Sequence, residues 1–318
     1  MMISWVIGSG GLLGTALCRA LQRNGDELFL PAERFFWGDE DALAAQVVQA
    51  VGKFSLKVKA VDQWQIFWAA GVGTMSSSAE ALGPETRALT RVLQALESHP
   101  QLMTKPGAIA FASSAGAIYA ESSDEIITEH SQPTPTTDYA RAKLLQEVLL
   151  SSFVRRNYCA SALLARISTL YGPGQATGKK QGLLTHMARC ILRNQPIQIY
   201  VPFDTIRDYI AADDAAAAMV SALAHISAPQ QTVIRIVASQ RPTTIAEIVS
   251  IFKRIARRGP RIVTSASRLS ALYTRRVQFR SMATQENASL PAVSLAVGIA
   301  RLMLQERVNL AHGDSLIE

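Results

Sequence analysis

The chain has 318 residues, with 32 Lys and Arg against 25 Asp and Glu. This length corresponds to about two domains, or to one large α/β domain with an appended lobe, and the 48% apolar content excludes wholesale disorder. The three cysteines are scattered and form no CxxC or Cys/His spacing, so we expect neither a disulfide framework nor a metal site. We see no signal peptide and no membrane span, and we expect a cytoplasmic protein with no membrane partner.

The first thirty residues predict a strand, a tight turn and a helix. Residues 3–7 are a short apolar run of the kind found in buried parallel strands. A glycine-rich turn with Gly8, Gly11 and Gly14 follows, and the next residues place an apolar stripe on one helical face. Such glycines allow a tight bend, the approach of a pyrophosphate to the backbone and close helix packing, while the helix N-terminus offers free N–H groups. The pattern therefore predicts a dinucleotide-binding turn.

Further apolar runs repeat along the chain and alternate with predicted helices. The strands are expected at 28–30, 65–70, 108–112, 162–167 and 233–237, and the helices at about 41–51, 85–97, 139–154 and 213–225. This alternation predicts an α/β fold with a doubly wound parallel sheet, the Rossmann fold. Because the composition shifts after Gly172, we expect a cofactor-binding domain over 1–172, which also receives about 205–237. The remaining part of 173–318 would form a smaller, mixed substrate-binding lobe.

The positive charge is concentrated in one segment. Residues 251–285 hold nine basic side chains and no acid, which leaves 23 basic against 25 acidic residues in the rest of the chain. Such a segment suits an anionic ligand, and the alternative is a set of solubilising arginines on a helix face. Since no helix-turn-helix, zinc or aromatic-basic signature accompanies it, we expect no nucleic-acid partner.

Tyr139 and Lys143 are spaced by four residues, which puts both side chains on one face of a helix. An ammonium about 4 Å from a phenol is worth roughly 4 kcal/mol at an effective dielectric of about 20, or about three pKa units. The pair could therefore bring Tyr139 into working range as an acid or base. The alternative is an exposed tyrosine on an ordinary helix.

Four further stretches accompany the glycine turn and the Tyr139–Lys143 pair. They are the serine loop at 113–119, the Tyr-Gly-Pro-Gly-Gln turn within 166–175, the Arg-Asp-Tyr-Ile segment at 207–214 and the last predicted helix at 291–301. Together these motifs resemble the extended short-chain dehydrogenase/reductase family, in its branch of NAD(P)-dependent nucleotide-sugar epimerases and dehydratases. The resemblance spans nearly the whole chain.

The resemblance implies a role for each matching residue. Tyr139 would be the catalytic acid/base, Lys143 would lower its pKa and hold the nicotinamide ribose, and Ser114, with Ser113 as the alternative, would bind the reacting oxygen. The cofactor would contact Gly8, Gly11, Gly14, Ala70, Tyr139, Lys143 and either Glu33 or Arg34. The substrate diphosphate would be met by Arg207, with Arg275 or Arg280 as a second contact and Thr169 where an Asn is usual.

The cofactor would be NAD or NADP, because an acid such as Glu33 favours NAD and an arginine such as Arg34 favours NADP. Asp213 and Asp214 are expected to cap a helix. The loop after Ser114 contains no acid, whereas the family's 4,6-dehydratases carry Asp-Glu there, and no cysteine of the kind used by epimerases acting next to a ketone lies near it. A 4-epimerase with bound NAD is therefore expected, with an NADPH-dependent 4-keto reductase or a non-catalytic nucleotide-binding relative as alternatives.

The two predicted helices at 85–97 and 139–154 also suggest an assembly. The second carries an apolar face wider than one core-facing stripe needs, with Leu149 among its residues. Relatives of the family pair these two helices across a four-helix interface. We therefore expect a homodimer as well as a nucleotide-sugar partner.

Overall fold

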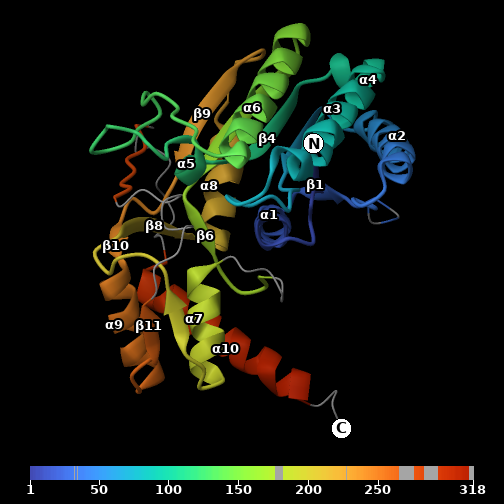
Figure 1. Ribbon diagram of the computed structural model, residues 1–318. Helices are drawn as coiled ribbons and strands as arrows, with labels where there is room; N and C mark the ends of the chain where they lie inside the picture. The colour runs from blue at the N-terminus through green and yellow to red at the C-terminus, as the bar shows by residue number, and fades with distance from the viewer. Residues whose placement is uncertain are drawn as a thin grey trace.

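The computed structural model describes residues 1–31, 33, 35–175, 182–226, 228–264, 276–282 and 293–314. Its centre is a six-stranded, all-parallel sheet in the order β2-β1-β3-β4-β5-β9 (Figure 1). The strands are β1 (Met2–Ile7), β2 (Glu27–Phe29), β3 (Gln63–Trp68), β4 (Gly107–Ser114), β5 (Ala160–Ile167) and β9 (Thr232–Val237). The expected doubly wound parallel sheet is confirmed.

Helices cover both faces of this sheet, which explains why its strands are apolar runs rather than alternating patterns. These helices are α1 (Leu12–Arg23), α2 (Glu40–Val58), α3 (Ala79–Glu97), α6 (Asp138–Arg156) and α8 (Ala212–Ala224), with the short α4 (Pro100–Met103) and α5 (Ala115–Ile118) between them. In β1, Trp5 and Ile7 point into the core under α2, α3 and α6, while Val6 points into the core under α1 and α8.

The order of the strands fixes where a ligand can enter. The chain leaves β1 for β2 on one side and later returns to β3 on the other side of β1. Parallel sheets of this kind have a crevice at the carboxyl ends of the strands where the winding direction changes. In this chain the glycine turn after β1 and the loop 69–73 after β3 flank that position.

The remaining elements build a second, smaller core. A three-stranded sheet is formed by β6 (Thr169–Tyr171), β8 (Ile206–Ala211) and β10 (Pro242–Thr244), and a two-stranded one by β7 (Ile197–Ile199) and β11 (Ile262–Thr264). Helices α7 (Leu183–Leu192), α9 (Ile245–Ala256) and α10 (Leu295–Asp314) complete this lobe, and a partly buried ion pair of 2.7 Å between Arg189 and Glu306 joins α7 to α10. Figure 1 shows β6, β8 and β10 between the large sheet and the lobe helices. Within the described ranges, no helix has the length and apolarity needed to cross a membrane.

Candidate active site

The glycine turn takes a shape that only glycines at two of its positions allow. Gly8 has φ +90°, and a Cβ on it would lie 2.5 Å from the backbone nitrogen of Ala70. A Cβ on Gly14 would lie 2.0 Å from the carbonyl oxygen of Gly8. These contacts draw α1 and the loop after β3 tightly around the turn, and they bring the predicted cofactor residue Ala70 directly beside it.

Gly11 has a different environment, which suits a ligand. A Cβ on Gly11 would meet only the Gly8 oxygen at 3.4 Å, and one on Gly10 would meet nothing within 4 Å. Packing within the protein therefore does not require glycine at these two positions. Gly11 is the N-cap of α1 and provides no side-chain cap for the first N–H groups of that helix. Open space in front of uncapped N–H groups fits the pyrophosphate of a dinucleotide.

Tyr139 and Ser114 meet beside this crevice. Tyr139 lies in the first turn of α6, which begins after an N-cap in which the Thr137 side chain accepts a hydrogen bond from the Ala140 N–H. Ser114 is the last residue of β4, and its side chain lies close enough to the Tyr139 side chain to lower the pKa of that phenol. The neighbouring Ser113 instead donates to Glu147 at 2.6 Å in the interior. This arrangement supports Ser114 over Ser113 as the hydroxyl that faces a substrate.

Lys143 lies one turn further along α6 and is buried, with 6% of its surface exposed. Its Nζ donates to the Ala112 carbonyl oxygen at 3.3 Å and lies 5.0 Å from the ring centroid of Phe111. The same nitrogen is 5.8 Å from the ring centroid of Tyr139. Helical spacing thus brings the two side chains together as the sequence predicts, with the ammonium under the ring.

The expected lowering of the Tyr139 pKa is not what the structure gives. Burial raises the pKa of Tyr139 to about 12, with a further increase from the Glu85 carboxylate, and the Ser114 side chain opposes both only in part. Burial also lowers the pKa of Lys143, which the carboxylates of Glu85 and Glu147 counteract. The simple pair estimate was wrong because it omitted the burial of the phenol and the neighbouring carboxylates.

A buried network anchors α6 to the sheet beneath these residues. Arg166 on β5 donates to both carboxylate oxygens of Glu147 at 3.0 and 2.6 Å, and it also donates to the Tyr119 hydroxyl at 2.5 Å. Arg166 and Glu147 are 3% and 4% exposed, so this ion pair is shielded from water. Because Glu147 lies one turn after Lys143 on α6, the network holds the face of that helix that carries Lys143 against β4 and β5.

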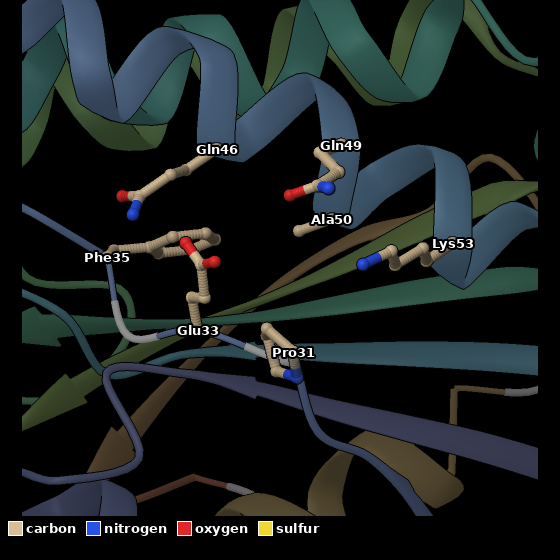
Figure 2. Close-up of a pocket in the computed structure, with 7 residues that line it drawn as sticks. All are labelled: Pro31, Glu33, Phe35, Gln46, Gln49, Ala50 and Lys53. Atoms are coloured by element: carbon tan, nitrogen blue, oxygen red, sulfur yellow. The ribbon is translucent and has the colours of Figure 1, made fainter.

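Glu33 and Arg34 are the two residues predicted to select between NAD and NADP. Figure 2 shows a hollow between the stretch after β2 and α2, and the Glu33 side chain points there toward α2, near Phe35 and Gln46. α2 covers the sheet face opposite to α1, the helix that follows the glycine turn. The Glu33 carboxylate is therefore not directed at that turn, and its cofactor contact stays a prediction. Arg34 lies outside the described residues.

The predicted phosphate-binding residues lie on the small sheet or beside it. Arg207 is half-buried on β8, where its guanidinium donates to the Ile206 carbonyl oxygen at 2.7 Å. Thr169 is exposed on the adjacent strand β6. Arg280 is exposed in a segment that pairs with β8 and with the stretch around Ile127, and Arg275 lies outside the described residues.

The residues of the basic segment that the structure describes do not gather at one site. Five of its exposed residues, Lys253, Arg254, Arg257, Arg258 and Arg261, lie at the end of α9 or just beyond it. That end is about 18 Å from β10, where the helix begins, because a helix rises about 1.5 Å per residue. This placement fits the interpretation of a solvated helix face for these five residues.

Asp213 and Asp214 do not cap a helix as expected. The N-cap of α8 is Ala211, which has no capping side chain, and the two acids stand in the first turn. Asp213 forms an ion pair of 2.6 Å with Arg19 of α1, and Asp214 accepts a hydrogen bond from the Val293 N–H. Both acids therefore connect α8 to neighbouring segments, and they still lie where the helix dipole favours negative charge.

Comparisons with known proteins identify the family of this chain. The family model described as "NAD dependent epimerase/dehydratase family" matches residues 5–236. The chain is 32% identical over 115 residues to dTDP-4-dehydro-6-deoxyglucose reductase of Escherichia coli, which covers 36% of each protein. It is 28% identical over 124 residues to dTDP-L-rhamnose 4-epimerase of Burkholderia thailandensis, which covers 39% of this chain and 33% of that protein. Each match thus spans about a third of the relative's length.

Among solved structures, the fold resembles that of UDP-glucose 4-epimerase of Thermus thermophilus in complex with NAD. The TM-score is 0.77 with 21% sequence identity, and the alignment covers 96% of this chain and 99% of the other. At this identity the likeness is one of fold. Because the family model spans most of the chain, including the glycine turn, the serine loop and the Tyr139–Lys143 helix, the protein belongs to the NAD-dependent epimerase/dehydratase family, of the extended short-chain dehydrogenase/reductase type.

Proposed function

We propose that the protein is an NAD(P)-dependent enzyme that oxidises or reduces carbon 4 of a nucleoside-diphosphate sugar, with 4-epimerase as the first candidate activity. The observation that carries this proposal is the juxtaposition of three side chains: Ser114 at the end of β4 acts on the Tyr139 phenol at the start of α6, and buried Lys143 lies under the Tyr139 ring. A phenol and a hydroxyl placed side by side in this way can bind one substrate oxygen and exchange a proton with it.

Each residue has a defined task in this proposal. The N–H groups around Gly11 hold the cofactor pyrophosphate, and Lys143 holds the nicotinamide ribose. When bound, the nicotinamide accepts or supplies the hydride. Tyr139 exchanges the proton of the sugar oxygen, which Ser114 orients. Arg207 binds the substrate diphosphate, a bidentate task suited to a guanidinium.

A 4-keto reductase is the second candidate because of the state of Tyr139. A phenol with a pKa of about 12 is protonated at neutral pH, and a protonated tyrosine can give its proton to a ketone. A dehydratase is disfavoured because the loop at 115–117 is Ala-Gly-Ala and offers no acid for elimination. The relatives in sequence include one protein described as a reductase and one as a 4-epimerase.

We further propose a cytoplasmic homodimer and a division into a cofactor domain, 1–172 with about 205–237, and a substrate lobe. Leu145 and Val148 of α6 are apolar and yet 51% and 57% exposed. Because α6 packs beside α3, the other helix expected at the interface, these exposed side chains support a partner on this pair of helices. Leu149 is instead partly buried against the main core. The residues available to a partner are therefore Leu145 and Val148.

The test combines cofactor identification with a turnover assay. Mass spectrometry of the purified protein identifies any retained NAD or NADP, and NMR follows UDP- and dTDP-hexoses for conversion to their 4-epimers. A 4-epimerase retains NAD and converts substrate without net production of NADH. A reductase consumes one NADPH for each 4-keto sugar supplied. A protein that binds neither dinucleotide and converts none of these sugars contradicts the proposal.

A further inference from the structure

Trp37 is a large aromatic residue that the sequence motifs do not include. Its side chain is 40% exposed, whereas each of the other three tryptophans of the chain is at most 3% exposed. Trp37 lies in the stretch that joins β2 to Asp39, the N-cap of α2. The structure thus leaves one indole ring open to water while it buries the rest, and such a ring offers a flat apolar face to a ligand.

A chain of contacts connects Trp37 to the glycine turn. Its ring packs edge-on against the ring of Trp68, with the centroids 6.4 Å apart and the planes at 85°. Trp68 is the last residue of β3 and pairs with Ile7, the last residue of β1. Two residues after Trp68, the backbone nitrogen of Ala70 lies 2.5 Å from the position of a Cβ on Gly8. Trp37 therefore stands at the carboxyl ends of β1 and β3, on the rim of the crevice.

Contacts before and after Trp37 hold its stretch in place. The ring of Phe35, which packs against the main core, lies 5.6 Å from the Trp37 ring between centroids. The Phe36 N–H donates to the side-chain oxygen of Gln46 on α2 at 2.8 Å. After Trp37, the Asp39 carboxylate accepts two N–H groups of the first turn of α2 at 3.0 and 2.9 Å. A ring fixed in this way has little freedom left to lose when a ligand binds to it.

The layout of the site decides which half of a dinucleotide reaches this ring. The nicotinamide half extends from the glycine turn past β4, toward Tyr139 and Lys143. The adenosine half extends from the same pyrophosphate in the opposite direction, toward β2 and the stretch that follows it. The Glu33 carboxylate in that stretch points toward α2 and not toward the glycine turn. The exposed indole of Trp37, which Trp68 holds at the ends of the strands, is therefore placed to meet the adenine.

We propose that Trp37 binds the adenine ring of the dinucleotide by stacking. An indole and an adenine both have a flat π face, and the contact removes apolar surface of both rings from water. Stacking needs no contact with the ribose 2′ position, so it serves NAD and NADP alike. The inference rests on the proposed function for the presence of a bound dinucleotide, and it does not depend on the sugar that the enzyme converts.

The test uses the tryptophan fluorescence of the whole chain, after charcoal has removed any retained dinucleotide. Because the other tryptophans are buried, the neutral quencher acrylamide should act mainly on Trp37, and Trp37→Phe identifies the Trp37 share of the emission. Calorimetry gives the concentration of NAD that saturates the site. At that concentration most of the quenching of Trp37 should disappear. ADP-ribose, which lacks the nicotinamide ring, should protect Trp37 as well as NAD does.

Three substitutions separate stacking from general packing. Trp37→Leu keeps an apolar side chain but removes the aromatic face, so it should weaken ADP-ribose binding by about 5- to 100-fold in calorimetry, the range of base–aromatic stacking. Trp37→Phe keeps an aromatic face and should restore most of this affinity. Phe36→Leu is the matched control: it removes the neighbouring ring, which is 68% exposed, and should leave the dissociation constant of ADP-ribose unchanged.

A Trp37 that stays open to acrylamide while calorimetry shows bound NAD overturns the inference and leaves the proposed function standing. Equal losses of affinity in Trp37→Leu and Phe36→Leu overturn it as well, since the effect would not belong to Trp37. If Trp37→Leu does not fold, the protection measured in the wild type decides. A protein that binds neither NAD nor NADP overturns the inference together with the cofactor of the proposed function. Protection by ADP-ribose in a protein that converts no nucleotide sugar supports the inference and counts against the sugar chemistry.

Discussion

The buried pair between Glu147 and Arg166 gives the sharpest prediction about stability, which concerns Glu147→Gln. The substitution keeps the shape of the side chain and removes the charge that Arg166 faces at 2.6 and 3.0 Å. Both side chains are nearly inaccessible to water, and breaking a pair of this kind costs roughly 3–5 kcal/mol because the remaining charge is left buried. The amide oxygen of the glutamine can still accept a hydrogen bond from Arg166. We therefore expect the free energy of unfolding to fall by about 3 kcal/mol, the lower end of that range.

A matched control comes from Glu97 on α3, which binds Arg156 of α6 at 2.8 Å in an ion pair whose arginine is 58% exposed. Exposed pairs contribute about 0.2–1 kcal/mol, so Glu97→Gln should have a small effect. In thermal unfolding at one scan rate, Glu147→Gln should lower Tm by roughly 6–12 °C and Glu97→Gln by less than about 4 °C. Equal shifts for the two variants would refute the assignment of Glu147 and Arg166 as the anchor of α6.

Three further predictions test the glycine turn, the phosphate contact and the assembly. Gly14→Ala places a Cβ 2.0 Å from a carbonyl oxygen, so it should weaken dinucleotide binding, measured by calorimetry, by roughly 10- to 100-fold. Gly10→Ala should leave Tm unchanged, because its Cβ meets nothing within 4 Å. Equal effects of the two substitutions on Tm would contradict the packing argument. Arg207→Ala should weaken nucleotide-sugar binding by roughly 2–4 kcal/mol and barely alter dinucleotide binding, and equal losses for both ligands would assign Arg207 a structural role. Light scattering at micromolar concentration should give the mass of a dimer for the wild type and of a monomer for Leu145→Lys. Leu56→Lys, a change at an exposed position on α2, should leave the dimer intact. A monomer mass for the wild type would exclude the dimer.

The sequence predicts the large sheet well because its strands are buried on both faces and read as apolar runs. Helix ends are predicted less well. α2 extends beyond the expected end at residue 51, through Gly52 to Val58, because Phe54 and Val58 add buried surface that outweighs the low helix propensity of one glycine. α3 begins at Ala79, after the Ser78 N-cap, and Pro84 lies inside it although prolines usually mark helix boundaries.

The lobe and part of the site could not be predicted in the same way. Its strands, such as β6 and β7, have three residues each, which is too short for a periodic pattern. Tyr139 and Lys143 share a helix, so their proximity follows from spacing alone. The approach of Glu85 to Tyr139 depends on the packing of α3 against α6, which no local pattern encodes. A sequence signal for Glu85 existed only in part, as an acid near the start of a helix that follows the Gly71–Gly73 loop.

The central claim is that Tyr139 transfers the substrate proton at a site where Ser114 and Lys143 hold the reactants. The most direct measurement compares wild-type protein with Tyr139→Phe for both turnover of the nucleotide sugar identified by the NMR assay and dinucleotide binding by calorimetry. Loss of a positioned acid/base should lower turnover by roughly 10²–10⁴-fold and leave the dissociation constant of the dinucleotide unchanged. Near-normal turnover in Tyr139→Phe would contradict the account.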